Sequence, residues 1–116
     1  MEQRIWGPKM IPLDVVIRDR THDLPAEART YVDKKVRGLG DHLSLVTSAD
    51  VEFDRDVKTR PEPLYVVKIT LHLLAHRASD LRVKETGRDQ RAGFDVAITR
   101  TEAAAVQLKE RIKARP

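Results

Sequence analysis

Residues 64–76 read LYVVKITLHLLAH, and this stretch decides the fold that we predict for the whole chain. Its odd positions from 65 to 73 are Tyr, Val, Ile, Leu and Leu, whereas Lys68, Thr70 and His72 lie between them. A period of two is typical of a β-strand with one buried face and one wetter face. Several β-branched side chains crowd the segment, which argues against a helix. We therefore predict a long central strand of a sheet.

The composition restricts the class of protein. A chain of 116 residues is long enough for one domain with a real core and too short for two. Aromatic residues make up only 4%, which argues against base stacking as the main mode of binding. There is no cysteine, so disulfides and thiolate metal sites are excluded. No apolar run approaches the roughly 20 residues that cross a bilayer, and the first ten residues lack the apolar core of a signal peptide. We expect a cytoplasmic protein without membrane contact.

Charge is distributed unevenly along the chain. The net charge is +4, but residues 64–116 carry +5 and residues 44–63 carry −2. A basic second half favours a polyanionic partner such as RNA, although an ordinary solvated surface explains the same numbers.

The other elements are predicted from their own periodicity and from turn signals. They are a strand at 12–18, a helix that opens near Thr21–Pro25 and runs to about residue 43, a strand at about 48–55, a strand at about 80–87 and a helix at about 90–113. Residues 1–11 contain Gly7-Pro8 and show no periodicity, so we predict a flexible N-terminal arm and one domain over residues 12–116.

The order β-α-β-β-β-α predicts an α+β fold. The first helix is long enough to cross over, so the first two strands should be parallel, and the last three can form an antiparallel meander. Each helix carries one apolar stripe, which in the last helix consists of Phe94, Ile98, Thr101, Ala105, Leu108 and Ile112. We therefore predict a two-layer sandwich in which both helices cover one face of a four-stranded mixed sheet.

No cluster of residues indicates catalysis or a metal site. His72 and His76 share a strand face but lie about 13 Å apart at ~3.3 Å per residue, which is too far for one metal ion. Asp50, Glu52 and Asp54 alternate on one strand face and could attract a cation, although such a row is more often the solvated side of a strand. Glycine-rich phosphate loops and Gly-x-Ser-x-Gly sequences are missing. We expect no enzyme, no cofactor and no metal.

Basic residues are the strongest candidates for a binding site. At 100° per residue, one flank of the last helix carries Arg100, Gln107 and Arg111, and the opposite flank carries Lys109 and Lys113. On the first helix Lys34 and Arg37 face away from the core, and Arg82 and Lys84 lie on the fourth strand. Guanidinium and ammonium groups spread over one side of a domain suit the regular phosphates of RNA. We take these nine residues as the candidate RNA-binding set.

The chain resembles the ribosome hibernation promoting factors of the ribosomal subunit interface protein (protein Y) family. The resemblance runs from about Leu13 to Lys113 and depends on the element order, the third strand VVKITLHLL and the fourth-strand region DLRVKETGRD. The last helix opens with DQRAGFD at residues 89–95, which is similar to the family's acidic-x-Tyr-Ala-Ala-Ile-Asp opening. The match is to the short form, without the C-terminal dimerisation domain of the long form.

This resemblance implies a compact domain similar to the double-stranded-RNA-binding fold. It also implies binding to ribosomal RNA of the small ribosomal subunit, across the messenger and transfer RNA sites, so that translation stops without any catalysis. In the family's last helix, basic residues at i, i+3 and i+7 meet ribosomal RNA; the matching positions here are Arg100, Ala103 and Gln107, of which only the first is basic. Arg91 stands where the family often has Tyr.

An alternative interpretation keeps the fold and changes the partner. The domain would then be a diverged protein-interaction or general RNA-binding module, which uses the exposed sheet face or the acidic segment before the long strand. A small enzyme is the least supported hypothesis.

The two apolar periodicities yield a test of the predicted core. Ile69 and Leu71 on the long strand should share one core with Phe94 and Ile98 on the last helix. We expect Ile98→Ala to lower the free energy of unfolding by about 2–5 kcal/mol, because it removes buried methylenes and leaves a cavity. Denaturant unfolding measures this loss, and a change below about 0.5 kcal/mol would show that the helix is rotated away from the sheet.

Overall fold

The computed structural model describes residues 13–42, 46–56, 64–73 and 80–114, with side chains described for all of these except 41, 42 and 112–114. Its elements are β1 (Asp14–Asp19), α1 (Ala26–His42), β2 (Val46–Asp56), β3 (Leu64–Leu73), β4 (Leu81–Gly87) and α2 (Gln90–Ala114). The predicted order is confirmed, and the boundaries that can be compared agree to within about two residues. The predicted N-terminal arm over residues 1–11, the loop at 58–63 and the end of the long strand at His76 lie outside the described residues.

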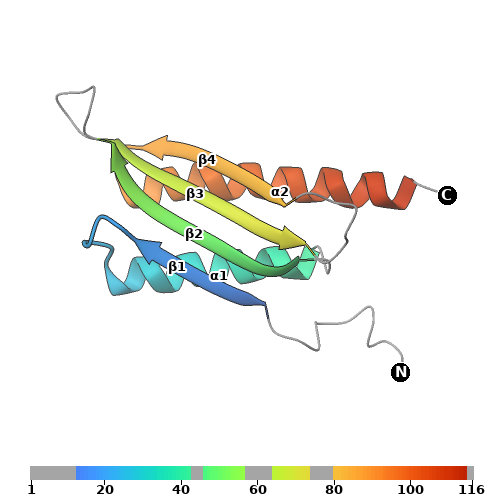
Figure 1. Cartoon of the computed structure of the whole chain (residues 1–116), viewed down its shortest axis with the longest axis horizontal. Helices are drawn as coiled ribbons and strands as arrows, with labels where there is room; N and C mark the ends of the chain where they lie inside the picture. The colour runs from blue at the N-terminus through green and yellow to red at the C-terminus, as the bar shows by residue number, and fades with distance from the viewer. Residues whose placement is uncertain (1–12, 43–45, 57–63, 74–79, 115–116) are drawn as a thin grey trace.

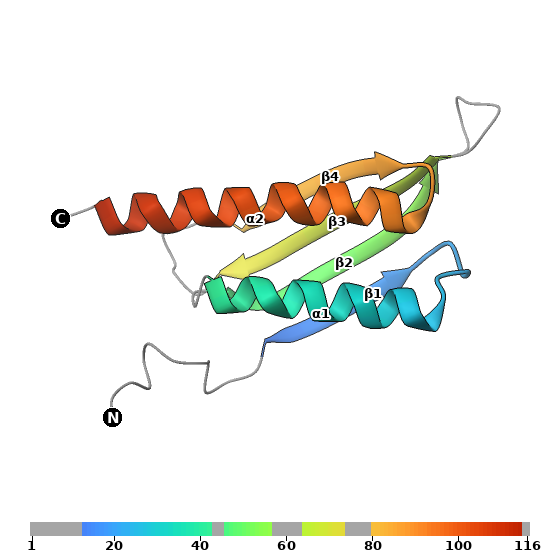
Figure 2. The same cartoon turned by 180° about the vertical axis from the view of Figure 1, so that it is seen from behind.

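The sheet has the predicted mixed topology. Its strands lie in the order β1-β2-β3-β4. The β1–β2 pair is parallel, whereas β2–β3 and β3–β4 are antiparallel. Figures 1 and 2 show α1 and α2 side by side on one face of the sheet, so that the other face is open. The expectation of an α+β two-layer sandwich is thus confirmed.

The core lies between the two central strands and the helices. Cross-strand pairs Ala49↔Leu71, Val51↔Ile69 and Phe53↔Val67 put six buried side chains on the helix side of β2 and β3. The buried residues that the helices contribute are Val32, Val36 and Leu39 from α1, and Phe94, Ala97, Ile98, Thr101 and Ala105 from α2. The predicted shared core of Ile69, Leu71, Phe94 and Ile98 is present, since all four belong to one buried cluster.

Polar contacts hold the beginnings of both helices together. Asp89 caps α2, because its carboxylate accepts a hydrogen bond of 2.7 Å from the backbone N–H of Ala92. The next residue, Gln90, donates from its side chain to Thr21 Oγ1 (3.1 Å) and to Asp23 Oδ1 (2.5 Å) in the loop before α1. The two helices therefore start at the same end of the sheet (Figure 2).

Two glycines let α2 begin directly against the sheet. A methyl group on Gly87, at the end of β4, would run into the backbone of Gly93 in the first turn of α2. A methyl group on Gly93 would lie 2.9 Å from Cγ2 of the buried Val67. Both positions thus need glycine for close approach and not for an unusual φ angle, since the described glycines all have negative φ.

This packing predicts opposite effects of alanine at three glycines. Gly87→Ala and Gly93→Ala should each lower the free energy of unfolding by about 1–3 kcal/mol, because the added methyl overpacks the contact between β4 and α2. Gly38→Ala is the matched control: it lies within α1 with nothing within 4 Å of the added carbon, and it should stabilise by about 0.5–1 kcal/mol. Denaturant unfolding of the three variants measures this, and equal effects would contradict the close approach.

Candidate nucleic-acid interface

Six of the candidate RNA-binding residues lie on the helical layer. They are Lys34 and Arg37 on α1, and Arg100, Gln107, Lys109 and Arg111 on α2, all with exposed side chains. Arg100 lies on the β4 side of α2, where it pairs with Glu85. The side chain of Lys113 is outside the described set.

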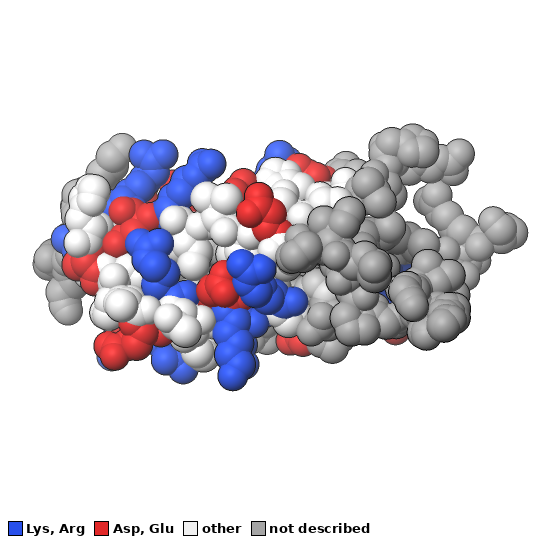
Figure 3. Space-filling view, turned by 90° about the horizontal axis from the view of Figure 1, so that it is seen from below, with Lys and Arg blue, Asp and Glu red and all other residues white. Residues whose placement is uncertain are grey.

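Arg82 and Lys84 lie on the opposite layer. Their neighbours Leu81 and Val83 pack against the core from β4, so the two basic side chains that alternate with them face the open side of the sheet. The candidate residues are therefore divided between both layers, instead of covering one side of the domain. Figure 3, which views the edge formed by β1 and α1, likewise shows Lys and Arg side chains interspersed with Asp and Glu.

Three of the candidate cations are engaged by neighbouring groups. Arg100 forms an ion pair with Glu85, and Arg82 lies 3.8 Å from Asp80. Arg37 is held by Asp33 at 2.9 Å and also donates to a backbone carbonyl of the chain before β1. Such exposed pairs add little stability, but they reduce the positive charge that is available to a phosphate.

Four candidate cations have no acidic partner in the part of the chain that the structure describes. Among the described residues, no acidic side chain lies within ion-pair distance of Lys34, Lys84, Lys109 or Arg111. These four are therefore the cations most available to phosphates.

The acidic row on β2 is satisfied by neighbouring donors. Glu52 pairs with Arg20 at 3.1 Å, Asp50 accepts from His72, and Asp54 accepts from the backbone N–H of Arg55. The described residues hold no group of three or more His, Asp or Glu side chains arranged for a metal ion. Each carboxylate of the row thus has a donor beside it, and the alternative of a cation site gains no support.

His72 connects two carboxylates on the open face of the sheet. Its Nε2 lies 2.9 Å from Asp50 on β2, and its Nδ1 lies 3.0 Å from Asp80, just before β4. The hydrogen bond to Asp50 is the largest cause that raises the pKa of His72 above its ordinary value of 6.5, although partial burial opposes it. The sequence indicated only a histidine on a strand face, because the partners depend on strand register and on the chain after β3.

Tyr31 joins the two helices through contacts that the sequence did not indicate. Its hydroxyl donates to Asp95 (2.7 Å), its ring meets Phe94 edge-on, and the guanidinium of Arg91 lies 3.5 Å from its ring centroid. The hydrogen bond to Asp95 raises the pKa of Tyr31. Arg91 therefore has a structural contact of its own: it stacks on a tyrosine of the other helix.

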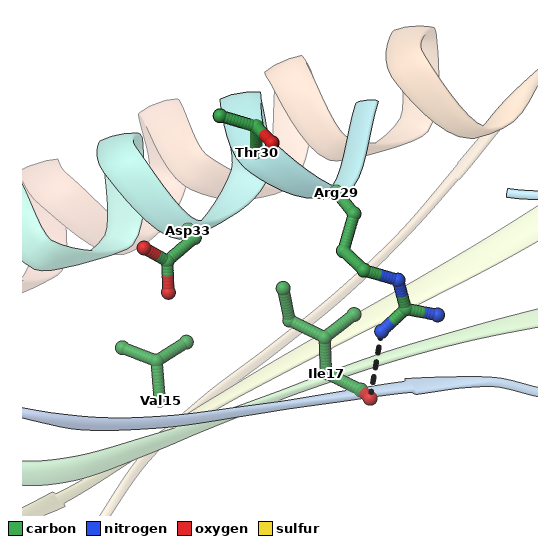
Figure 4. Close-up of a pocket in the computed structure, with 5 residues that line it drawn as sticks. All are labelled: Val15, Ile17, Arg29, Thr30 and Asp33. Carbon is green, nitrogen blue, oxygen red and sulfur yellow. Dashed lines mark hydrogen bonds between the residues drawn. The ribbon is translucent and has the colours of Figure 1, made fainter. Parts of the chain in front are cut away.

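A hollow lies between β1 and α1. It is open to solvent and is lined by Val15, Ile17, Arg29, Thr30 and Asp33 (Figure 4). Arg29 donates across it to the carbonyl oxygen of Ile17 at 3.5 Å. The carboxylate in its lining, Asp33, is paired with Arg37 at 2.9 Å. None of the described helices has the length and apolar character of a membrane span.

Comparison with known proteins identifies the family. The family described as Sigma 54 modulation protein / S30EA ribosomal protein matches residues 15–113. The chain belongs to this family. Its members are non-enzymatic, ribosome-associated proteins of the hibernation-factor and protein Y type, as the resemblance implied.

Two solved structures share the fold. A ribosomal subunit interface protein from Coxiella burnetii has a TM-score of 0.64 and 12% identity, and the alignment covers 84% of this chain and 98% of the other. The N-terminal domain of Protein Y from Thermus thermophilus has a TM-score of 0.63 and 23% identity, over 81% of this chain and 94% of the other. No curated protein matches the sequence.

The His72 contacts predict a specific dependence of stability on pH. Because the folded state raises the pKa of His72, protonation favours folding; the stabilisation is complete below the unfolded pKa near 6.5 and is lost as the pH rises through the higher folded pKa. The neutral variant His72→Gln lacks this titration. Melting temperatures of both proteins, measured between about pH 5 and 9, should differ most at the acidic end and converge at the basic end. A difference that does not depend on pH would show that the two carboxylates do not hold His72.

Proposed function

We propose that this domain binds the small ribosomal subunit across the messenger and transfer RNA sites, and that it stops translation by occupying them. The observation that carries the proposal is the family match over residues 15–113, to a family of ribosome-associated proteins. Occupancy needs no chemistry, which agrees with a non-enzymatic family. A ribosome partner would also place the protein in the cytoplasm.

Phosphate contacts supply the binding energy in this proposal. Lys34, Lys109 and Arg111 lie on the helical layer and Lys84 lies on the open face of the sheet, all exposed. A domain that sits in a channel lined by ribosomal RNA meets phosphates on more than one side, so cations on both layers can contribute. Because such contacts read charge and backbone spacing, binding should have little base selectivity.

Salt dependence tests the electrostatic character of the complex. With a few phosphate contacts, the logarithm of affinity should fall linearly with the logarithm of salt concentration, with a slope of roughly −0.7 to −0.9 per contact. Cosedimentation with purified small subunits over a series of salt concentrations measures this slope. Binding that does not respond to salt, or that strongly prefers one short RNA sequence, would contradict the proposal.

Charge variants on α2 test which surface is used. Ala103 and Gln107 are exposed, so Ala103→Lys and Gln107→Lys should leave the core intact, and each should steepen the salt slope by about one if α2 faces RNA. Lys109→Glu should weaken binding. We prefer it to Arg100→Glu, which would place a second carboxylate beside Glu85.

Asp54→Lys is the control for net charge, because it makes a larger charge change on β2, away from α2. Equal gains from Asp54→Lys and from the α2 variants would mean that only total charge matters. If no variant alters cosedimentation, the ribosomal site is wrong, and the alternative of a protein-interaction module on the same fold takes its place.

A further inference from the structure

The outer edge of β1 has backbone groups that point away from the sheet. β1 is the first strand in the sheet order, so among the described strands it is paired only with β2. The backbone N–H of Arg20 donates to the carbonyl of Phe53 on β2 at 2.8 Å. Because backbone groups alternate between the two edges of a strand, the even-numbered residues of β1 face β2 and the odd-numbered residues face outward.

Arginines of α1 contact two of these outward carbonyls, and one residue between them is uncovered. Arg37 donates to the oxygen of Leu13, and Arg29 donates to that of Ile17 at 3.5 Å, the long limit of a hydrogen bond. Between them, the N–H and C=O of Val15 have no outward partner among the described residues, and Val15 lies in the hollow beside α1 (Figure 4). This part of the edge can accept another strand.

The exposed side chains of β1 are complementary to themselves. Asp14, Val16 and Arg18 face the open side, and Val16 is 37% exposed, one of the few large exposed apolar residues among those described. If two copies of β1 run antiparallel about Val16, the two valines face each other and each Asp14 lies opposite an Arg18. The same register sets Val15 opposite Ile17, and both of these are outward-facing, as hydrogen-bonded pairs require.

Neighbouring registers lack this match. Pairing about Val15 sets Asp14 against Val16, and pairing about Ile17 sets Val16 against Arg18. Only the register about Val16 places unlike charges opposite each other and apolar side chains opposite apolar side chains.

We propose that β1 is a homodimer interface, in which two copies of this chain pair antiparallel about Val16. The interface is isologous, and the two four-stranded sheets become one continuous sheet with the helices of both copies on the same face. Pairing at Val15 and Ile17 displaces the long contact from Arg29 to the carbonyl of Ile17. The contact from Arg37 to the carbonyl of Leu13 is kept, because Leu13 lies beyond these two pairs. This inference does not depend on ribosome binding.

Charge reversal tests the register directly. Asp14→Arg places Arg opposite Arg18, and Arg18→Asp places Asp opposite Asp14, so each variant alone should dimerise roughly tenfold more weakly than the wild type. An equimolar mixture of the two variants should form a heterodimer, and the double variant should recover the homodimer, because unlike charges then face each other again. Sedimentation velocity of the full chain over a range of concentrations measures all four cases. A wild type that stays monomeric at every concentration, or single variants that dimerise as well as the wild type, would overturn the proposal.

Proline supplies a second test that leaves side-chain charge unchanged. The N–H of Val15 points outward, so Val15→Pro removes a donor from the dimer but none from the β1–β2 ladder. Circular dichroism should show that the Val15→Pro variant is folded, and sedimentation should show that it is monomeric. Val16→Pro is the matched control, because its N–H faces β2 and its loss should lower the melting temperature of the monomer itself. A Val15→Pro protein that dimerises with wild-type affinity would also overturn the proposal.

Discussion

The backbone contact between Gly87 and Gly93 determines how the helical layer lies on the sheet. Because neither residue has a side chain, the first turn of α2 rests directly on the end of β4, and Cγ2 of Val67 lies close to where a side chain of Gly93 would be. This fixes the rotation of α2 at its start. Phe94, the next residue, then points into the core, with its ring centroid 6.4 Å from that of Phe53. The same rotation decides which residues of α2 face solvent.

The positions of the charged residues follow from this arrangement. With Phe94 and Ile98 buried, Arg100 lies above β4 and meets Glu85, while Asp95 and Arg91 turn toward Tyr31 on α1. Cations that lie over the sheet or the other helix thus gain acidic or aromatic partners. Those farther along α2, Lys109 and Arg111, extend past these partners. The proposed binding surface therefore depends as much on which cations are neutralised as on where basic residues occur in the sequence.

Much of the fold could be predicted because burial leaves a periodic trace in the sequence. The alternation in β3 and the stripe through Phe94 and Ile98 both record which side chains avoid water, and together they specify the sheet, its helical face and the shared core. The pairs of His72 with Asp50 and of Tyr31 with Asp95 leave no such trace, because their partners are 22 and 64 residues apart. The sequence could also have separated Arg82 from the cations of the helices. Because Arg82 alternates with Leu81 along β4, it should face the open side of the sheet, and the structure places it there.

We propose that this fold occupies the messenger and transfer RNA sites of the small subunit through phosphate contacts. Two solved structures share the fold at 12% and 23% identity. The fold alone therefore does not decide the partner, which must be tested on the complex itself. Electron cryo-microscopy of purified small subunits mixed with the protein at low salt tests it most directly. We expect density for one β-α-β-β-β-α domain in the messenger and transfer RNA sites, with Lys109 and Arg111 beside the ribosomal RNA backbone. Empty sites, or density bound to a ribosomal protein elsewhere on the subunit, would contradict it.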